Sequence, residues 1–413
     1  MATKWTETNL QEKKGVGTEH LIVAMVDRVL SLLDKPGMRA VIAASVDWAS
    51  AFSRTDPTIT ITKFVNMGVR SSLVNILIEF LEDRQMSVSF NQEKSGLYTL
   101  IGGGPQGFWT GQQCFLTASD DNASFVNQED GYKYCDDLTI LELVMLGEIL
   151  TQYDTLNNVY QRFLPTQRLE SQKNLDRISS WTKENLMELN ESKTNYLIFT
   201  RSNTPISTSL TIKKKNNRNK KETKLLGVWL EEDGRWNKNT RELCKKGYAR
   251  VSMITKLKYA GVSIEELIHN YKQFVRVVLE YCSVAWHSSL TERQAHSLER
   301  VQAVCLRIIL EDNYVSYSAA CEMTGLSTLA ERRQSRCLDF GLKAIKHPKN
   351  QRFFPENPIV NTQIATRDSE AYIVNFSRTE AYRKSAIPYV QRLLNKHVKE
   401  KEKEGGEGEG RGR

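Results

Sequence analysis

Hydrophobic residues follow a helical period at the start of the chain and a strand-like run soon after it. Behind Thr18, which can cap a helix, apolar residues recur every three or four positions and predict an amphipathic helix that ends near Pro36: Leu21, Ile22, Met25, Val29, Leu32 and Leu33. Residues 40–46 are all small or apolar and predict a buried strand that ends on Asp47. The chain therefore begins with a helix and a core strand that carries a carboxylate at its end.

The next segments alternate between helical and strand-like patterns. Residues 71–81 predict a second helix whose buried face consists of Leu73, Ile76, Leu77, Phe80 and Leu81. Residues 86–90 and 97–101 predict a β-hairpin, joined by a polar loop that ends at Gly96. A third helix is expected from Gly107 to about Ser119.

A second hairpin is expected at residues 131–140, and the later part of the chain is largely helical. Residues 141–160 fit either helix or loop, 166–189 predict a helix, and 195–199 predict a strand. Further helices are expected near 238–258, 263–282 and 292–310, with helical signals to about Lys346. The Lys/Glu-rich and Gly-rich end, residues 399–413, is expected to be a disordered low-complexity tail.

Composition and charge restrict the class of protein. The 413 residues suffice for two or three domains, and the net charge of +8 is compatible with an anionic partner, although many proteins with this charge bind no nucleic acid. Seven scattered cysteines without a C-x-x-C pair argue against a disulfide scaffold or a zinc site. No apolar run reaches membrane-spanning length, and the first residues do not resemble a signal peptide. These features predict an intracellular protein of the cytoplasm or nucleus with no membrane partner.

Adjacent carboxylates mark the candidate chemistry. Asp136 and Asp137 lie between β-prone flanks, which places them at the tip of the second hairpin. Two neighbouring negative charges repel each other, and a hard cation such as Mg²⁺ relieves that repulsion because it takes oxygen ligands. Taken alone, the pair is better explained as a solvated turn, in which Asp-Asp is common. A metal site becomes the better interpretation because Asp47 ends a buried strand and can meet the hairpin, so that Asp47 and Asp136 would hold two cations.

A glycine-rich segment lies between these acids. Glycines in residues 102–107 allow the backbone to approach a ligand closely, and Gln106 can both donate and accept hydrogen bonds. A single segment of this kind is weak evidence. The order of a strand-ending Asp, Gly-Pro-Gln-Gly and aromatic-x-Asp-Asp is much more specific.

This order resembles the core motifs of reverse transcriptases, and most closely those of non-LTR retrotransposons of the jockey and LINE kind. The segments that carry the resemblance, over roughly residues 10–310, are Asp47–Phe52, Gly104–Gly107 and Tyr134–Asp137, with Gly15–His20, Leu189–Thr194, Leu225–Val228, Leu279–Trp286 and Leu298–Val304 in support. The resemblance implies an α+β fold: a polymerase palm with an antiparallel sheet packed on helices, then an all-helical thumb. It divides the chain into a residual fingers segment (1–38), a palm (39–234), a thumb (235–346) and a C-terminal extension (347–413).

The resemblance also implies the function and the roles of single residues. The expected activity is RNA-directed DNA polymerisation, which extends a DNA primer on an RNA template from dNTPs with two Mg²⁺ ions, or Mn²⁺ in their place. Asp47 and Asp136 would ligate the metals with support from Asp137, and Lys193 would protonate pyrophosphate. The substrate-binding residues would be Phe52, which excludes the ribose 2′-hydroxyl, and Gly104, Pro105, Gln106 and Gly107. There are simpler alternatives: Phe52 could be a core phenylalanine and Lys193 a surface lysine. The basic loop Lys213–Lys221 could contact phosphates, since it lies beside Leu225–Val228, which resembles the primer-grip hairpin of the family, or it could simply be solvated.

Several departures from the family pattern favour a second hypothesis. The chain starts almost at the Gly15–His20 segment, so the fingers that clamp the triphosphate are expected to be truncated, and no endonuclease or RNase H pattern is present. Ser53 replaces the usual Asp or Asn, and the bulky Phe108 follows Gly107 where the family has Ser. Positioning is a large part of phosphoryl-transfer catalysis. A catalytically inactive, nucleic-acid-binding remnant is therefore the alternative to an active polymerase.

Overall fold

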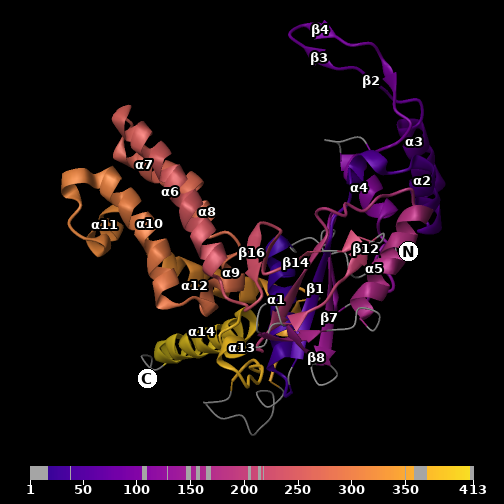
Figure 1. Ribbon diagram of the computed structural model, residues 1–413. Helices are drawn as coiled ribbons and strands as arrows, with labels where there is room; N and C mark the ends of the chain where they lie inside the picture. The colour runs from indigo at the N-terminus through magenta and orange to yellow at the C-terminus, as the bar shows by residue number, and fades with distance from the viewer. Residues whose placement is uncertain are drawn as a thin grey trace. The chain divides into compact units, whose positions relative to one another are not determined.

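The computed structural model describes residues 17–409, except for 38, 105–108, 128, 146–149, 155–158, 164–168, 203–205, 213–214, 217, 349 and 358–369. The described chain forms two compact units (Figure 1). The sheet unit runs from Gly37 to Lys221, and the helical unit combines Gly17–Pro36 with the chain from Glu222 onward. The protein is mixed α+β, as the sequence predicts.

A five-stranded sheet with the order β14-β10-β1-β7-β6 forms the centre of the sheet unit. Its strands are β1 (Arg39–Val46), β6 (Gly131–Tyr134), β7 (Asp137–Met145), β10 (Asn195–Thr200) and β14 (Arg218–Lys220). All neighbours are antiparallel except β10 and β14. The predicted core strand β1 pairs on both sides and is almost entirely buried. Its small and apolar residues suit this position because both of its faces are covered.

Helices of the sheet unit complete its core. They are η1 (Ala51–Arg54), α2 (Pro57–Asn66), α3 (Ser71–Leu81), α4 (Trp109–Ala118) and α5 (Glu170–Glu184). Leu175, Ile178 and Trp181 of α5 share one apolar cluster with Ile42 of β1. Since these α5 residues lie at helical spacing, the amphipathic pattern places the correct face of α5 on the sheet.

The predicted buried face of α3 is wrong in part. Val74 and Leu81 are buried, whereas Leu73, Ile76 and Phe80 are 52%, 60% and 37% exposed. Apolar residues occur on two sides of this helix, so their spacing alone cannot select one. Packing against α2 and Cys114 selects the side of Val74 and leaves the other side in contact with solvent among the described residues.

A narrow β-ribbon leads away from α3 (Figure 1). Its strands are β2 (Gln85–Met86), β3 (Ser89–Phe90), β4 (Glu93–Lys94) and β5 (Tyr98–Thr99), paired β2 with β5 and β3 with β4. The hairpin is as predicted, and its turn at Asn91 and Gln92, both with positive φ, lies within the expected loop, although Glu93 and Lys94 of that loop form a strand. Two consecutive residues with positive φ match the twist of a two-residue hairpin turn.

Short strands replace the helix or loop expected at residues 141–160. β7 continues to Met145, and β8 (Leu150–Asp154) pairs with β9 (Val159–Phe163), which in turn pairs with β11 (Ile206–Ser207). The predicted basic loop Lys213–Lys221 contains β13 (Lys215–Asn216) and β14, and β12 (Thr211–Ile212) precedes it. These strands are too short and too polar for a periodic pattern to reveal them.

Glu142 of β7 caps the N-terminus of α5. Its carboxylate accepts the backbone N–H groups of Glu170 and Ser171, each at 2.8 Å, and the hydroxyl of Ser171. The first N–H groups of a helix have no partner within the helix, and the helix dipole favours a negative charge there. This side chain therefore ties α5 to the central sheet.

Replacing Glu142 with Ala is expected to lower the free energy of unfolding by about 2 kcal/mol, because the cap and its charge-assisted bonds are lost. Urea denaturation followed by circular dichroism measures the change. The control is Glu170→Ala, which removes only exposed ion pairs to Lys173 and Arg177. Equal losses in the two variants would contradict the capping role.

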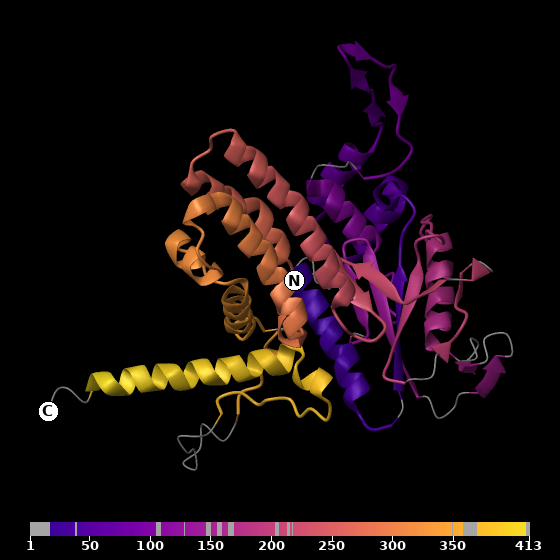
Figure 2. The same cartoon turned by 60° about the vertical axis from the view of Figure 1, so that its left-hand side comes forward.

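The helical unit contains α1, one short hairpin and the C-terminal helices. Its elements are α1 (Thr18–Asp34), β15 (Glu222–Leu225), β16 (Val228–Glu231), α6 (Asn237–Tyr259), α7 (Ile264–Asn270), the π-helix η4 (Tyr271–Arg276), α8 (Val277–Leu279), α9 (Ser283–Trp286), η5 (His287–Ser289), α10 (Glu292–Leu310), η6 (Glu311–Asn313), α11 (Tyr317–Thr324), α12 (Leu329–Ala344), η7 (Gln351–Phe353), α13 (Glu380–Arg383) and α14 (Ala386–Glu409). The three helices predicted between residues 238 and 310 correspond to α6, α7–α8 and α10. Figure 2 shows α6 and α10 side by side, and α12 lies against α14.

Domain boundaries differ from those that the resemblance implies. Helix α1, expected in a residual fingers segment, packs on α9, α13 and α14. Residues 222–234, expected in the palm, also belong to the helical unit, as do the described residues after 347. The tail expected to be disordered from residue 399 continues α14 as far as Glu409. Ion pairs such as Lys396–Glu400, at 3.6 Å and one helical turn apart, favour helix in this Lys/Glu-rich sequence. None of the described helices has the length and apolar character needed to cross a membrane.

Candidate active site

Strand pairing places the three predicted carboxylates at the same end of the sheet. Along the antiparallel ladder of β1 and β7, Ser45 pairs with Thr139 and Val46 with Leu138. Continued by one residue beyond the paired positions, this register would set Asp47 across from Asp137. In antiparallel strands, residues directly opposite one another lie close. Residues ninety positions apart in sequence therefore meet at one end of the sheet.

The β6–β7 turn presents Asp136 and Asp137 at its tip, as the sequence predicts. Tyr134 pairs with Asp137, which leaves Cys135 and Asp136 as the two turn residues. Cys135 has φ +59°, a conformation that residues other than glycine adopt at some cost. Strained backbone of this kind is concentrated at functional sites.

Electrostatic coupling is consistent with the closeness of these carboxylates. Burial, together with the neighbouring charges of Asp136 and Asp47, raises the pKa of Asp137 to about 6. Burial also raises the pKa of Asp47. The positive charge of Lys193 opposes this increase, and the negative charge of Asp136 adds to it. Both carboxylates are thus less stable as anions than in water, and a bound cation would reverse this effect.

The segment Glu188–Thr194 holds Asp47 in place. The backbone N–H of Asp47 donates to Thr194 Oγ1 at 3.2 Å, and its carbonyl accepts the N–H of Asn190 at 2.8 Å. The neighbouring Trp48 forms a β-bridge with Leu189. Lys193 Nζ lies 4.0 Å from Asp47 Oδ2, so this segment also brings the predicted general acid to the site. The sequence singled out Lys193 but did not predict that the hydroxyl of Thr194 accepts a hydrogen bond from Asp47. Thr194 directly follows Lys193 in the sequence and precedes β10.

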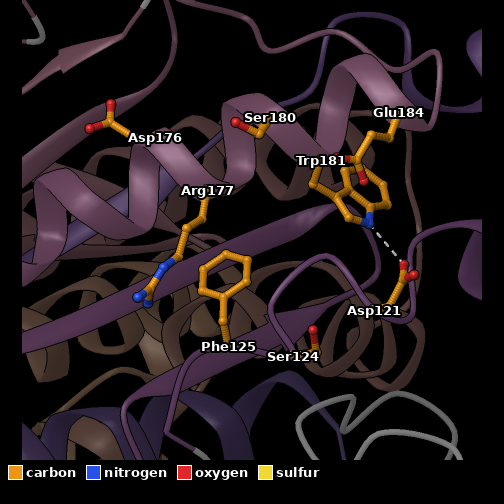
Figure 3. Close-up of a pocket in the computed structure, with 8 residues that line it drawn as sticks. All are labelled: Asp121, Ser124, Phe125, Asp176, Arg177, Ser180, Trp181 and Glu184. Carbon is orange, nitrogen blue, oxygen red and sulfur yellow. Dashed lines mark hydrogen bonds between the residues drawn. The ribbon is translucent and has the colours of Figure 1, made fainter.

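Behind Asp47, Trp48 packs edge-on against Trp181, with ring centroids 5.6 Å apart. Figure 3 shows the indole N–H of Trp181 directed at Asp121, to which it donates at 2.9 Å. Lys63 pairs with the same carboxylate at 2.6 Å. Asp121 and Trp181 border an open hollow of about 420 Å³ that Phe125 and Arg177 also line. The network fixes the backbone on which Asp47 sits, and sequence reasoning missed it because its members lie on separate elements.

Phe52 and the glycine-rich segment lie next to each other. Phe52 is half-buried, with its ring 4.8 Å from that of Phe115, and its carbonyl accepts the N–H of Gly104 at 2.8 Å. A Cβ atom at Gly103 would lie 3.0 Å from the carbonyl oxygen of Ser53, and φ there is +83°. A side chain at residue 103 is therefore unfavourable. Phe52 contacts the core while keeping an exposed part, so both of its predicted roles remain open.

The remaining predicted substrate-binding residues, Pro105, Gln106 and Gly107, lie outside the described residues. Gly104 is described, and a Cβ atom there would lie 3.2 Å from the carbonyl oxygen of Gly111 at the start of α4. Glycine at residue 104 thus permits a close approach of two backbone segments. This contact accounts for one glycine of the motif by packing alone.

Donor chemistry at the site fits Mg²⁺. Asp47 Oδ2 is a buried carboxylate oxygen without a hydrogen-bond partner among the described residues. Apart from the ion pair with Lys193 at 4.0 Å, this anionic oxygen has no polar partner in the described part of the chain that would occupy it, and such an oxygen is suited to a hard cation. Over the described residues, no three His, Cys, Asp or Glu side chains already form a metal-binding group. Mg²⁺ in enzymes that act on phosphates is commonly held by one or two carboxylates, with water and phosphate completing its shell.

Comparisons with known proteins give a limited likeness. No protein-family sequence profile matches the chain, and no curated protein sequence matches it significantly. Among solved structures, telomerase from Candida albicans in complex with the TWJ fragment of telomeric RNA is similar at 11% identity and a TM-score of 0.36, covering 84% of this chain and 54% of that chain. Apo telomerase from Candida tropicalis is similar at 11% identity and a TM-score of 0.40, covering 82% and 50%. The chain spans about half the length of these structures, and the scores are too low to establish a shared fold.

Proposed function

We propose that the protein is an RNA-directed DNA polymerase of the non-LTR retrotransposon kind, which extends a DNA primer on an RNA template from dNTPs. The observation that supports this most strongly is the β1–β7 register, whose continuation by one residue would set Asp47 opposite Asp137, at the hairpin tip that carries Asp136. The motifs that prompted the proposal are far apart in the sequence, and an unrelated fold would have no reason to bring their acids to one place.

The carboxylates provide the proposed catalytic surface. Asp47 and Asp136 would hold two Mg²⁺ ions, and the β6–β7 turn keeps Asp137 beside them. Bound there, the metals would supply Lewis-acid activation of the primer 3′-hydroxyl and stabilisation of the leaving pyrophosphate. Lys193, placed by the Asn190–Thr194 turn, is the proton donor to pyrophosphate. Phe52 excludes the ribose 2′-hydroxyl, and Gln106 and Gly107 contact the template–nucleotide pair.

Primer extension tests this proposal. The wild-type chain is incubated with an RNA template annealed to a DNA primer, dNTPs and Mg²⁺, and compared with Asp136→Ala. Extension by the wild type that is lost in the variant supports the proposal. Salt-sensitive duplex binding without extension in either protein would overturn it in favour of a non-catalytic nucleic-acid-binding remnant.

Lys193 provides a second functional prediction. Lys193→Ala is expected to reduce the rate of extension at saturating dNTP by about 10²-fold, because proton donation to the leaving group is lost. Rapid-quench kinetics measures the rate. Lys193→Arg keeps the charge but cannot release a proton at neutral pH, so it should be nearly as slow. A Lys193→Arg variant with the wild-type rate would contradict proton donation and favour simple charge stabilisation.

Helix α6 of the helical unit carries a stripe suited to a nucleic-acid backbone. Exposed side chains recur at helical spacing along one face: Arg241, Lys245, Tyr248, Ser252, Lys256 and Tyr259. Lysine and arginine neutralise phosphates, and exposed tyrosines such as Tyr259, which is 86% exposed, can stack on bases or sugars. We infer that this stripe binds the template–primer duplex.

Replacing Lys245 and Lys256 together with Ala is expected to weaken RNA–DNA duplex binding equally for all sequences. It should also reduce the salt dependence of log K by roughly two, about one for each lost phosphate contact. Fluorescence anisotropy at several salt concentrations measures both quantities. The control pair is Lys401→Ala with Lys403→Ala, two exposed lysines of α14. The same change in both double variants would indicate a general charge effect and not the α6 stripe.

A further inference from the structure

The hairpin of β15 and β16 ends in a turn that needs external support. Leu225 pairs with Val228, so Leu226 and Gly227 form a two-residue turn with φ values of +45° and +89°. Such turns favour Asn-Gly because both residues adopt positive φ. Leucine has no side-chain group that could compensate this conformation, and an isolated two-stranded hairpin is only marginally stable.

Tyr281 contacts this turn directly. Its hydroxyl donates a hydrogen bond to the carbonyl of Leu226 at 2.7 Å. A Cβ atom at Gly227 would lie 2.9 Å from ring carbon Cε1 of Tyr281, so the ring lies against the turn where only glycine fits. The tyrosine thus holds the turn by a polar contact at one residue and by close packing at the next.

The backbone around Tyr281 is itself fixed. Its carbonyl accepts the indole N–H of the buried Trp286 at 3.1 Å. Cys282, with φ +50°, separates α8 from α9. The buried indole therefore sets the orientation of Tyr281 from within the helical unit.

The start of α1 braces the same segment. Glu19 accepts the backbone N–H of Val284 at 3.3 Å, and its other oxygen lies 3.4 Å from Arg336 Nη2. Arg336 Nε also donates to Ser283 Oγ at 3.2 Å. Burial raises the pKa of Tyr281, while a hydrogen bond with the side chain of Thr18 lowers it. Parts of three segments that the sequence singled out, Gly15–His20, Leu225–Val228 and Leu279–Trp286, thus form one connected assembly.

We propose that Tyr281 is a positioning residue that anchors the Leu226–Gly227 turn, so that the hairpin presents a rigid backbone to the primer strand. Thr18 and Glu19 at the start of α1 act as the brace that keeps Tyr281 in place. The effect on primer extension rests on the proposed polymerase function, whereas the contact of Tyr281 with the turn does not. The ring of Tyr281 supplies packing, and its hydroxyl supplies the bond that fixes the turn.

Tyr281→Phe separates these two contributions because it keeps the ring and removes only the hydrogen bonds of the hydroxyl, among them the one to the Leu226 carbonyl and the one with Thr18. Hydrogen–deuterium exchange of the amides in residues 222–231 is expected to become about five- to tenfold faster, as the loss of one hydrogen bond to the turn implies. The rate of primer extension at saturating dNTP should fall by a similar factor, while KM for dNTP and Kd for the duplex stay unchanged. Tyr314→Phe, a ring-preserving change elsewhere in the helical unit, is the control and should leave all four quantities at wild-type values.

Two results would overturn the proposal: unchanged exchange in the hairpin, or faster exchange with an unchanged extension rate. If the Tyr281→Phe variant failed to fold, Glu19→Gln, which weakens the brace without touching the turn, should show the same faster exchange in residues 222–231. A wild-type chain that extends no primer would refute the proposed function. The exchange comparison alone would then decide whether Tyr281 anchors the turn.

Discussion

Asn in place of Asp47 is expected to reduce primer extension by about 10³-fold or more, because a ligand shared by both proposed metals is lost. The fold should not suffer from this change. Burial raises the pKa of Asp47, so its negative charge is already unfavourable there, and Asn removes that charge at nearly constant volume. The backbone bonds that hold Asp47, to Thr194 and Asn190, do not involve its carboxylate. Single-turnover extension with Mg²⁺ measures the rate.

Asp83→Asn is the matched control for this substitution. Asp83 is an exposed aspartate of the sheet unit with φ +46°, a conformation that Asn tolerates well. It should extend primers at the wild-type rate. Duplex Kd should also stay within about twofold of the wild type in the Asp47 variant, because phosphate contacts elsewhere dominate affinity. An Asp47→Asn protein that extends primers within about tenfold of the wild type would contradict a shared metal pair.

Asp27→Asn is expected to stabilise the helical unit above neutral pH by as much as about 4 kcal/mol, and to flatten its dependence on pH. Asp27 is buried in α1, and one of its oxygens has no hydrogen-bond partner among the described residues. Burial raises its pKa from 3.8 to about 7, against the opposing effect of the positive charge of Arg28. Burial and the charge of Asp27 raise the pKa of Tyr382 to about 12, so its hydroxyl stays neutral over this pH range.

The sign of the effect follows from proton binding. Below about pH 4 the side chain is protonated in both states, and its contribution to stability is fully present. As the pH rises to about 7 the unfolded chain ionises while the folded chain keeps the proton, so the free energy of unfolding falls. Asn carries no charge and removes this loss. Urea denaturation between pH 4.5 and pH 8 measures the change.

Asp339→Asn tests whether the effect is specific. Asp339 is an exposed aspartate of α12, and its replacement should leave the wild-type pH profile intact. If Asp27→Asn is no more stable than the wild type at pH 8, the carboxylate of Asp27 has a compensating partner, and the account of its burial is wrong.

Local sequence pattern predicted the strand and the turn of the site but not how they meet. Seven small or apolar residues before Asp47 predict β1, and the flanks of Asp136 predict the β6–β7 hairpin, because both signals are local. The register of β1 on β7 is long-range and depends on which residues share a buried face. No local signal contained the contacts of Thr194 with Asp47 or of Trp181 with Trp48.

Elsewhere, prediction failed where local preference left more than one choice. Helix α3 is apolar on two sides, and only its packing on α2 decides that Ile76 is exposed while Val74 is buried. The strands β8 and β9 are stabilised by pairing with each other, which single-residue preferences do not encode. The helical period of α1 was evident, but its packing on α9 and α14 involves residues more than 250 positions away.

The most direct test of the account is the position of manganese in crystals of the wild-type chain with an RNA template, a DNA primer and a non-hydrolysable dNTP. Mn²⁺ prefers the same oxygen ligands as Mg²⁺ and gives an anomalous signal. The account predicts anomalous peaks within about 2.2 Å of carboxylate oxygens of both Asp47 and Asp136. Manganese that contacts neither residue, or that binds the β6–β7 turn without Asp47, would contradict it.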